Sequence, residues 1–428
     1  MTIDGIERAL CGNETRKREP VGYSRSPPNT LVMVEPTLLA TLAVATLASL
    51  FMAWAIGAGS SGSTPFAPAV GANAISVMRA GFLVGLLGLA GATLQGANVS
   101  EAVGQELIGG YTLSPAGATL ALLLAAGLVA FGVFTGYPIA TAFTVTGAVV
   151  GIGLAAGGDP AWAKYREIVT LWVATPFVGG GIAYGVAKTL RDERVPERVA
   201  VPTLAGLVAV LLANVNFVLL GGPGEQSSIA VELAALAGQS TLVGRAGVSV
   251  AFAAVIAALL YRDLQADAAA AQRHFLLVLG GLVAFSAGGS QVGLAIGPLL
   301  PLLGPNTGVQ VPLETVLLFG GIGLLAGSWT GAPRMIKAIA QDYSSLGPRR
   351  SIAALIPSFA IAQTAVLFGI PVSFNEIIVS AIIGSGYAAG DGAVSGEKMG
   401  KTVLAWIGSL ALALGLGYGL FAVWTSVV

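Results

Sequence analysis

The chain has 428 residues and no net formal charge; 55% of its residues are hydrophobic and 10% are charged. A soluble domain is about 25% charged, so this composition indicates an integral membrane protein, and the neutral balance gives no sign of a nucleic-acid partner. Its long unbroken apolar runs exclude a β-barrel, whose strands alternate in segments of about 10 residues.

Residues 1–34 are polar and are expected to form an N-terminal extension, without the apolar core of a signal peptide. Beyond them, apolar runs long enough to cross a hydrocarbon core of about 30 Å predict an all-α protein of about twelve transmembrane helices. These runs lie near 36–56, 80–95, 115–135, 139–156, 168–187, 200–221, 244–261, 275–303, 312–328, 351–369, 371–388 and 402–427. A short additional or re-entrant element is expected at 228–240.

Polar segments fall between these runs, as loops should. KTLRDERVPER (188–198) and RMIKAIAQDYSSLGPRR (334–350) are rich in lysine and arginine. Because cytoplasmic loops carry an excess of these residues, both segments are predicted to face the cytoplasm.

The chain contains an internal repeat. AWAIGAGSSGS around Gly57 matches AFSAGGSQVGLAIGP around Gly288, GYPIATAF (136–143) matches GIPVSFNE (369–376), and Leu171-Trp172 matches Ala405-Trp406, at offsets of 231 to 234 residues. A repeat of this length predicts two related halves. We divide the chain into the extension 1–34, a first repeat 35–190, connecting helices 191–269 and a second repeat 270–428.

The Gly- and Ser-rich runs of the two halves predict broken helices. A backbone group left without a hydrogen bond in hydrocarbon costs several kcal/mol, so a helix breaks at membrane depth only where protein or a water-filled cavity meets the freed groups. Paired breaks in two halves are typical of a transporter's binding site, and the N-terminus of a half-helix attracts anions. The expected binding residues in the breaks are Ser60, Ser61, Ser63, Thr64, Ser290 and Gln291.

The matched Gly-x-Pro segments predict the turns of two hairpins that dip into the membrane, because proline removes a backbone donor within an apolar run. These turns would deliver Thr141, Thr144, Ser373 and Asn375 toward the centre. Glu376 follows directly, and carboxylates inside membranes are costly and mark ion or proton sites; a position at a hairpin mouth in contact with water is the other interpretation. A single histidine excludes a His-rich metal site, so no metal site and no cofactor other than a coupling ion is expected.

At these residues the chain resembles the inorganic phosphate transporter family, the PiT type of sodium- or proton-coupled permease. FSAGGSQVGLAIGP stands where the family has a phrase like FSHGANDVANAIGP, and PVSFNEIIVSAIIGSGYAAG resembles its PVSTTHALVGAVIGVGLARG. The resemblance covers nearly all of 40–190 and 275–428. It implies inverted repeats, a phosphate substrate and a cell-membrane location, and family permeases are often homodimers.

The family's Asn-Asp pairs, implicated there in binding sodium and phosphate, are replaced by Gly59-Ser60 and Ser290-Gln291, and its hairpin histidines by Phe143 and Glu376. Neutral side chains cannot supply the Coulomb attraction of a carboxylate for a cation. Cation binding should therefore weaken, the site should repel anions less, and coupling would pass to a proton carried by Glu376.

The sequence therefore predicts a secondary transporter of phosphate or a similar oxyanion that works by alternating access. A permease for another anion such as sulfate is one alternative, and a non-transporting regulator on the same scaffold is another. An enzyme is not expected, since no nucleophile with an adjacent base and no P-loop is found.

Overall fold

The structure, a computed structural model, describes residues 36–217, 220–221, 226–239, 241–303, 309–390 and 394–427. The predicted extension 1–34 lies outside these residues. The first part of the chain forms α1 (Pro36–Gly59), α2 (Ala67–Gly71), α3 (Val77–Gln95), α4 (Ala97–Gln105), β1 (Ile108–Gly109), α5 (Pro115–Thr135), α6 (Thr141–Ala155), β2 (Asp159–Pro160) and α7 (Trp162–Arg191).

The middle of the chain forms α8 (Glu197–Asn214), β3 (Asn216–Phe217), β4 (Ser227–Ser228), α9 (Ile229–Leu236) and α10 (Leu242–Ala266). The remainder forms α11 (Ala268–Ile296), a 3-10 helix η3 (Gly297–Leu303), α12 (Leu313–Thr330), α13 (Ala332–Asp342), α14 (Pro348–Leu367), α15 (Phe374–Tyr387) and α16 (Gly396–Val427). The pairs β1–β2 and β3–β4 are antiparallel and two residues long.

The predicted all-α membrane architecture is confirmed. Ten helices of the described residues are long and apolar enough to cross a membrane, and each lies at a position where a span is predicted. The remaining two predicted spans, 139–156 and 371–388, are occupied by α6 and α15, with 15 and 14 residues. These are shorter than the 17 to 25 residues usual for a span, so the number of twelve spans stays a prediction.

Helices α5 and α6 form one hairpin, and α14 and α15 form another. The β1–β2 pair joins the chain just before α5 to the chain just after α6, and an isolated bridge between Ser344 and Val394 does the same around α14 and α15. Each hairpin therefore enters and leaves at one end of the molecule. Both turns contain a glycine in the left-handed region, Gly136 (φ 75°) and Gly369 (φ 60°), a conformation that glycine adopts at no steric cost.

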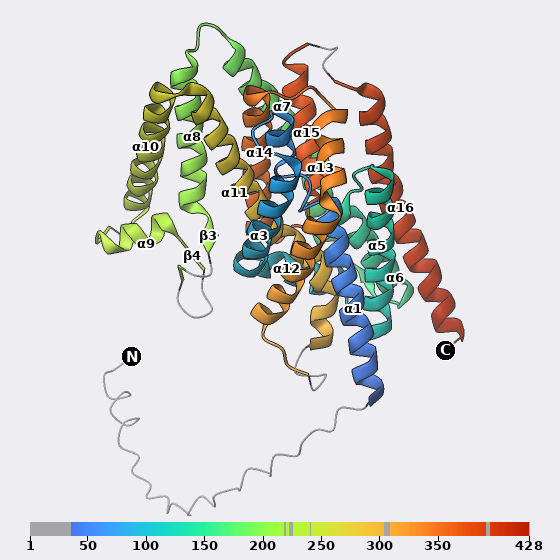
Figure 1. The fold of residues 1–428 in the computed structure, drawn as a ribbon. Coiled ribbons are helices and arrows are strands. Elements are labelled where there is room, and N and C mark those ends of the chain that lie inside the picture. The colour runs from blue at the N-terminus through green and yellow to red at the C-terminus, as the bar shows by residue number, and fades with distance from the viewer. Residues whose placement is uncertain are drawn as a thin grey trace, which may run out of the picture. The chain divides into compact units, whose positions relative to one another are not determined.

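The two hairpins open at opposite ends of α7. Strand β2 is separated from the first residue of α7 by Ala161 alone, whereas Arg191, the last residue of α7, donates a hydrogen bond to the carbonyl oxygen of Ala388 just after α15. Helix α7 runs the height of the bundle between these points (Figure 1). The tips of the two hairpins meet inside the bundle. There the side-chain nitrogen of Asn375 donates a hydrogen bond to the carbonyl oxygen of Ile139 at 2.6 Å.

One of the two predicted helix breaks is correct and the other is wrong. Helix α1 ends at Gly59 and turns follow up to α2, as predicted. Residues 286–293 are instead helical throughout, within α11. Their glycines serve packing: a Cβ on Gly288 would lie 1.9 Å from the carbonyl oxygen of Gly88 in α3. Helices in lipid associate through such small residues, so this Gly-rich run marks a close helix contact and not a break.

Helices α8, α9 and α10 form a group at one side of the bundle (Figure 1). The short element predicted at 228–240 is α9, which covers Ile229–Leu236. Helix α10 packs along α8 and leaves almost all its side chains at the surface, as expected of a helix that faces lipid.

Candidate functional site

The first half of the site is the turn that follows α1. The backbone N–H groups of Ser63 and Thr64 both lie 3.0 Å from the carbonyl oxygen of Ser60, and their hydroxyls donate to the same oxygen at 3.2 and 3.0 Å. Gly62 allows this turn, since a Cβ there would lie 1.9 Å from the Gly57 carbonyl oxygen. The hydroxyls of Ser63 and Thr64 are therefore engaged by the Ser60 carbonyl, which also accepts their backbone N–H groups, and Ser61 is buried in the same turn.

Ser60, Thr141 and Gln291 form a hydrogen-bonded network at the centre of the bundle. The Gln291 side-chain oxygen of α11 accepts bonds from the Ser60 hydroxyl at 3.1 Å and from the Thr141 hydroxyl of α6 at 2.8 Å. Its amide nitrogen donates to the carbonyl oxygen of Val372, in the second hairpin tip. All three side chains are fully buried. The network thus joins the end of α1, both hairpins and α11, and it pairs the equivalent positions 60 and 291 of the two halves.

Asn375 connects the second hairpin to the same centre. Its side-chain nitrogen donates to the carbonyl oxygens of Gly59 at 2.9 Å and of Ile139 at 2.6 Å. Gly59 is the last residue of α1, whose final carbonyls have no partner within the helix. Asn375 therefore satisfies the end of α1 and holds the tip of the first hairpin against it.

Four buried polar atoms at this centre have no hydrogen-bond partner among the described residues. They are the hydroxyls of Ser290 and Ser373, the side-chain oxygen of Asn375 and one carboxyl oxygen of Glu376. Ser290 adjoins Gln291, and Ser373 adjoins Val372. Buried polar atoms are nearly always paired in folded proteins, so four unpaired ones on α11 and the second hairpin, two elements that the network joins, indicate a place built to receive a polar ligand or water.

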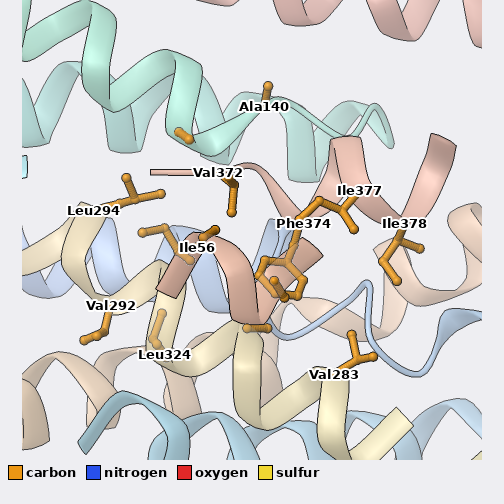
Figure 2. Packing of buried hydrophobic residues seen from close by; sticks show 14 of the residues in the cluster. Ile56, Ala140, Val283, Val292, Leu294, Leu324, Val372, Phe374, Ile377 and Ile378 are labelled. Carbon is orange, nitrogen blue, oxygen red and sulfur yellow. The ribbon is translucent and has the colours of Figure 1, made fainter. Parts of the chain in front are cut away.

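An apolar shell surrounds the network. Figure 2 shows Ile56 of α1, Leu294 of α11, and Val372 and Phe374 of the second hairpin converging where these elements meet. None of them is more than 1% exposed. In such a water-poor setting a hydrogen bond is electrostatically stronger, and an unmet one costs more.

Of the remaining predicted residues, Thr144 lies on α6 but outside the network. Its hydroxyl donates to the carbonyl oxygens of Ala140 at 2.8 Å and Thr141 at 3.2 Å, within its own helix. The Thr144 hydroxyl is therefore engaged by the backbone of its own helix and takes no part in the network.

Glu376 faces a second place, a cavity of about 720 Å³ between α7, α15 and α16. Phe143, Trp172 and Trp406 are among its other walls, and the Phe143 and Trp172 rings stack with centroids 3.9 Å apart. Among the described residues, Glu376 is the one Asp, Glu, Lys or Arg that is buried, at 2% exposed. The carboxyl therefore stands between the central network, one residue away at Asn375, and this otherwise apolar cavity.

The network offers only neutral oxygens to a cation. Its oxygens are neutral hydroxyls, amides and carbonyls, and no group of three or more His, Cys, Asp and Glu side chains that could hold a metal ion occurs in the described part of the chain. Sodium would rest on neutral oxygens alone, with Glu376 as the nearest carboxyl. The unpaired hydroxyls of Ser290 and Ser373 can donate to an oxyanion, and the unpaired Asn375 oxygen can accept from the O–H of a protonated one.

Two functional positions were not predicted from the sequence as site residues, Trp172 and Trp406. Their indole N–H groups donate to the carbonyl oxygens of Pro371 and Pro138, at the tips of the hairpins, both at 2.8 Å. The signal that could have found them is the repeat itself, because these two tryptophans correspond to one another at an offset of 234 residues.

Comparison with known proteins assigns the family. The profile of the phosphate transporter family matches residues 56–417. The chain is 24% identical over 92% of its length to a Thermococcus kodakarensis protein named "Putative phosphate permease", of which 99% is covered. It is 26% identical over 83% of its length to the chloroplastic inorganic phosphate transporter 2-1 of Arabidopsis thaliana, of which 68% is covered.

A solved structure shares the fold. It is a sodium-dependent phosphate transporter that superimposes with a TM-score of 0.76 at 22% identity, covering 91% of this chain and all of that one. Together with the family match along most of the chain, the broken helix and the two opposed hairpins place this multi-pass membrane protein among transporters: it belongs to the phosphate transporter family.

Proposed function

We propose that the protein carries inorganic phosphate across the membrane as a secondary transporter. Phosphate would bind where the end of α1, α11 and the two hairpin tips meet. The unpaired hydroxyls of Ser290 and Ser373 would donate to it, the Asn375 side-chain oxygen would accept from a phosphate O–H, and Ser60, Thr141 and Gln291 would exchange bonds with one another for bonds to phosphate. The observation that carries this proposal is the set of unpaired buried atoms beside the network. Ser61, Ser63, Thr64 and Thr144 would hold the turn and the helix start in place.

The arrangement of the hairpins supports alternating access. They open at opposite ends of α7, and their tips meet at fully buried residues, so the described conformation is closed around the centre. Separation of one tip from α1 and α11 would open the centre to one side, and separation of the other tip to the opposite side. We infer that the two repeats, 35–190 and 270–428, are inverted, with 191–269 connecting them, which is the usual organisation of such transporters.

We further propose that protons rather than sodium ions drive transport. The network lacks carboxylates, whereas Glu376 lies one residue from Asn375 and reaches a separate cavity. A carboxyl that gains and loses a proton there would change the charge beside a bound anion. The structural neighbour is named sodium-dependent, and the carboxylate-free network is the reason to expect a different ion here.

Uptake by purified protein in liposomes tests the transport proposal. Radiolabelled phosphate should accumulate, and unlabelled phosphate should compete better than sulfate. Stronger competition by sulfate would assign another oxyanion. No uptake of either anion under proton or sodium gradients would favour a non-transporting regulator on this fold.

Separate gradients test the coupling ion. An inward proton gradient without sodium should drive uptake, and Glu376→Gln, which keeps size and polarity but cannot ionise, should remove that dependence. Glu101→Gln, at an exposed glutamate, is the control and should behave as wild type. Uptake that requires sodium in both wild type and Glu376→Gln would reject the proton proposal. A homodimer stays a prediction, which the mass of the purified protein in detergent would decide.

A further inference from the structure

The end of the molecule where α7 stops and α14 starts holds a polar cavity, and none of the residues of the central network is among its walls. It has a volume of about 390 Å³, and its walls include Arg191, Glu197, Gln272, Gly347, Arg349 and Arg350. The last residue of α7 and the first turn of α14 therefore share one pocket, and Ala389, which follows the second hairpin, is another of its walls.

The single carboxylate of this pocket is already saturated. Arg349 donates two parallel hydrogen bonds to Glu197, each 3.0 Å long, and Gln272 donates a third to the same carboxylate at 2.6 Å. A fork-shaped guanidinium–carboxylate pair of this kind is one of the strongest polar contacts in proteins. Glu197 thus neutralises Arg349 and leaves the charges of Arg191 and Arg350 uncompensated.

Arg191 and Arg350 are held in place by neutral groups. Arg191 donates to the Ala388 carbonyl oxygen at 2.8 Å, and Arg350 donates to the Ser345 hydroxyl at 3.1 Å. The other terminal nitrogen of Arg350 is buried without a hydrogen-bond partner among the described residues, and its charge is repelled by that of Arg191. Two like charges and a buried unpaired donor in one pocket favour the binding of an anion.

The start of α14 adds donors to this pocket. Gly347 precedes the helix and Pro348, which has no N–H group, is its first residue, so the N–H groups of Arg349 and Arg350 have no partners within the helix. The helix dipole adds a partial positive charge at the same point.

We propose that this pocket binds a phosphoryl group, held by Arg191, Arg350 and the first turn of α14. The ligand would join the end of α7 to the base of the second hairpin, so it would stabilise the packing of that hairpin from outside the transport path. The pocket lies between the two basic segments 188–198 and 334–350, which by the positive-inside tendency face the cytoplasm. The phosphoryl group comes either from free orthophosphate or from the headgroup of an anionic lipid.

Binding and stability measurements on the full chain in lipid nanodiscs test this proposal. In the first arm, orthophosphate is titrated onto protein in discs of neutral phosphatidylcholine, and the number of bound phosphates is counted. In the second arm, the thermal midpoint is compared, without phosphate, between neutral discs and discs that contain phosphatidic acid. We expect either phosphate binding in the first arm or a raised thermal midpoint in the second. The double variant Arg191→Gln plus Arg350→Gln should remove that response, because each lost arginine contact lowers the affinity by roughly tenfold or more.

Arg194→Gln is the matched control, because Arg194 is an exposed arginine of the same basic segment but not of the pocket. The single variant Arg191→Gln, at an exposed helix end, keeps the test valid if the double variant misfolds. It should lose part of the phosphate or lipid response. If the double variant and Arg194→Gln behave alike in both arms, the site does not exist.

The outcome is independent of the transport proposal. A phosphate that persists in the double variant belongs to the central network. A response that depends on Arg191 and Arg350 in a protein with no central binding would reject transport and leave this site standing.

Discussion

The indole N–H of Trp172 donates a hydrogen bond to the Pro371 carbonyl oxygen, and the equivalent Trp406 makes the same 2.8 Å bond to Pro138. Each tryptophan stands on the long helix that follows its own hairpin and holds the tip of the other hairpin. The bonds therefore cross between the two halves. They satisfy carbonyls that the extended tip segments would otherwise leave buried and unpaired.

We expect Trp172→Phe and Trp406→Phe to lower the free energy of unfolding by about 1–3 kcal/mol each, the cost of leaving a buried carbonyl unpaired. Both variants should also reduce phosphate uptake, because either tip loses its anchor. Unfolding in detergent followed by circular dichroism measures the first effect. Trp329→Phe is the control, since its indole bond to Phe82 is exposed and 3.3 Å long; a loss as large in this control would show that the tip bonds have no special role.

The Thr141 hydroxyl gives a test of the central network. Thr141→Val keeps the shape of the side chain but removes its bond to Gln291, so uptake at low phosphate should fall by about tenfold or more, with roughly 1.5 kcal/mol for each lost bond. Thr175→Val is the matched control: Thr175 is also buried, and its hydroxyl bonds within its own helix, to Leu171. Equal uptake by Thr141→Val and wild type would remove the network from the binding site.

Close packing of α3 against α11 predicts a strong effect at Gly288. A Cβ there would lie 1.9 Å from the carbonyl oxygen of Gly88, so Gly288→Ala must push two helices apart, at a cost of about 1–3 kcal/mol or more. On the same helix, a Cβ at Gly281 would meet only the end of the Leu87 side chain, at 3.4 Å. Gly281→Ala should therefore be nearly neutral in the same unfolding assay, and similar midpoints for the two variants would contradict the packing account.

Gly288 also shows where the sequence misleads. Glycine in an apolar run has two uses in a membrane, to release the helix or to let another helix approach, and composition does not separate them. The run after Gly57 contains Thr64-Pro65 as well as glycine and serine, and there the helix does end. The run around Gly288 continues as helix until Ile296. What distinguishes a helix break from a close helix contact at Gly288 is the contact with Gly88, which is 200 residues away in sequence.

The hairpins and their polar residues could be predicted from the sequence, because proline and glycine determine the turn locally and occur at matched positions of a repeat. The partners of those residues were not. Asn375 was predicted to face a ligand, yet its nitrogen closes the end of α1 at Gly59. Ser63 and Thr64 likewise serve the Ser60 carbonyl. Whether a buried polar side chain faces a ligand or the backbone depends on long-range packing, which a local pattern does not encode.

Ser373 provides a prediction in which stability and binding change in opposite directions. Its buried hydroxyl has no partner among the described residues, so Ser373→Ala removes an unmet group and should leave the phosphate-free protein as stable as wild type or more so. The same change should weaken phosphate binding, because that hydroxyl is a proposed ligand. Ser49→Ala is the control with the reverse pattern: its buried hydroxyl donates to the carbonyl oxygen of Ala295 at 2.9 Å, so stability should fall while affinity stays unchanged. Thermal midpoints with and without phosphate measure both quantities, and a loss of phosphate-free stability in Ser373→Ala would mean that this hydroxyl is a structural contact and not a ligand.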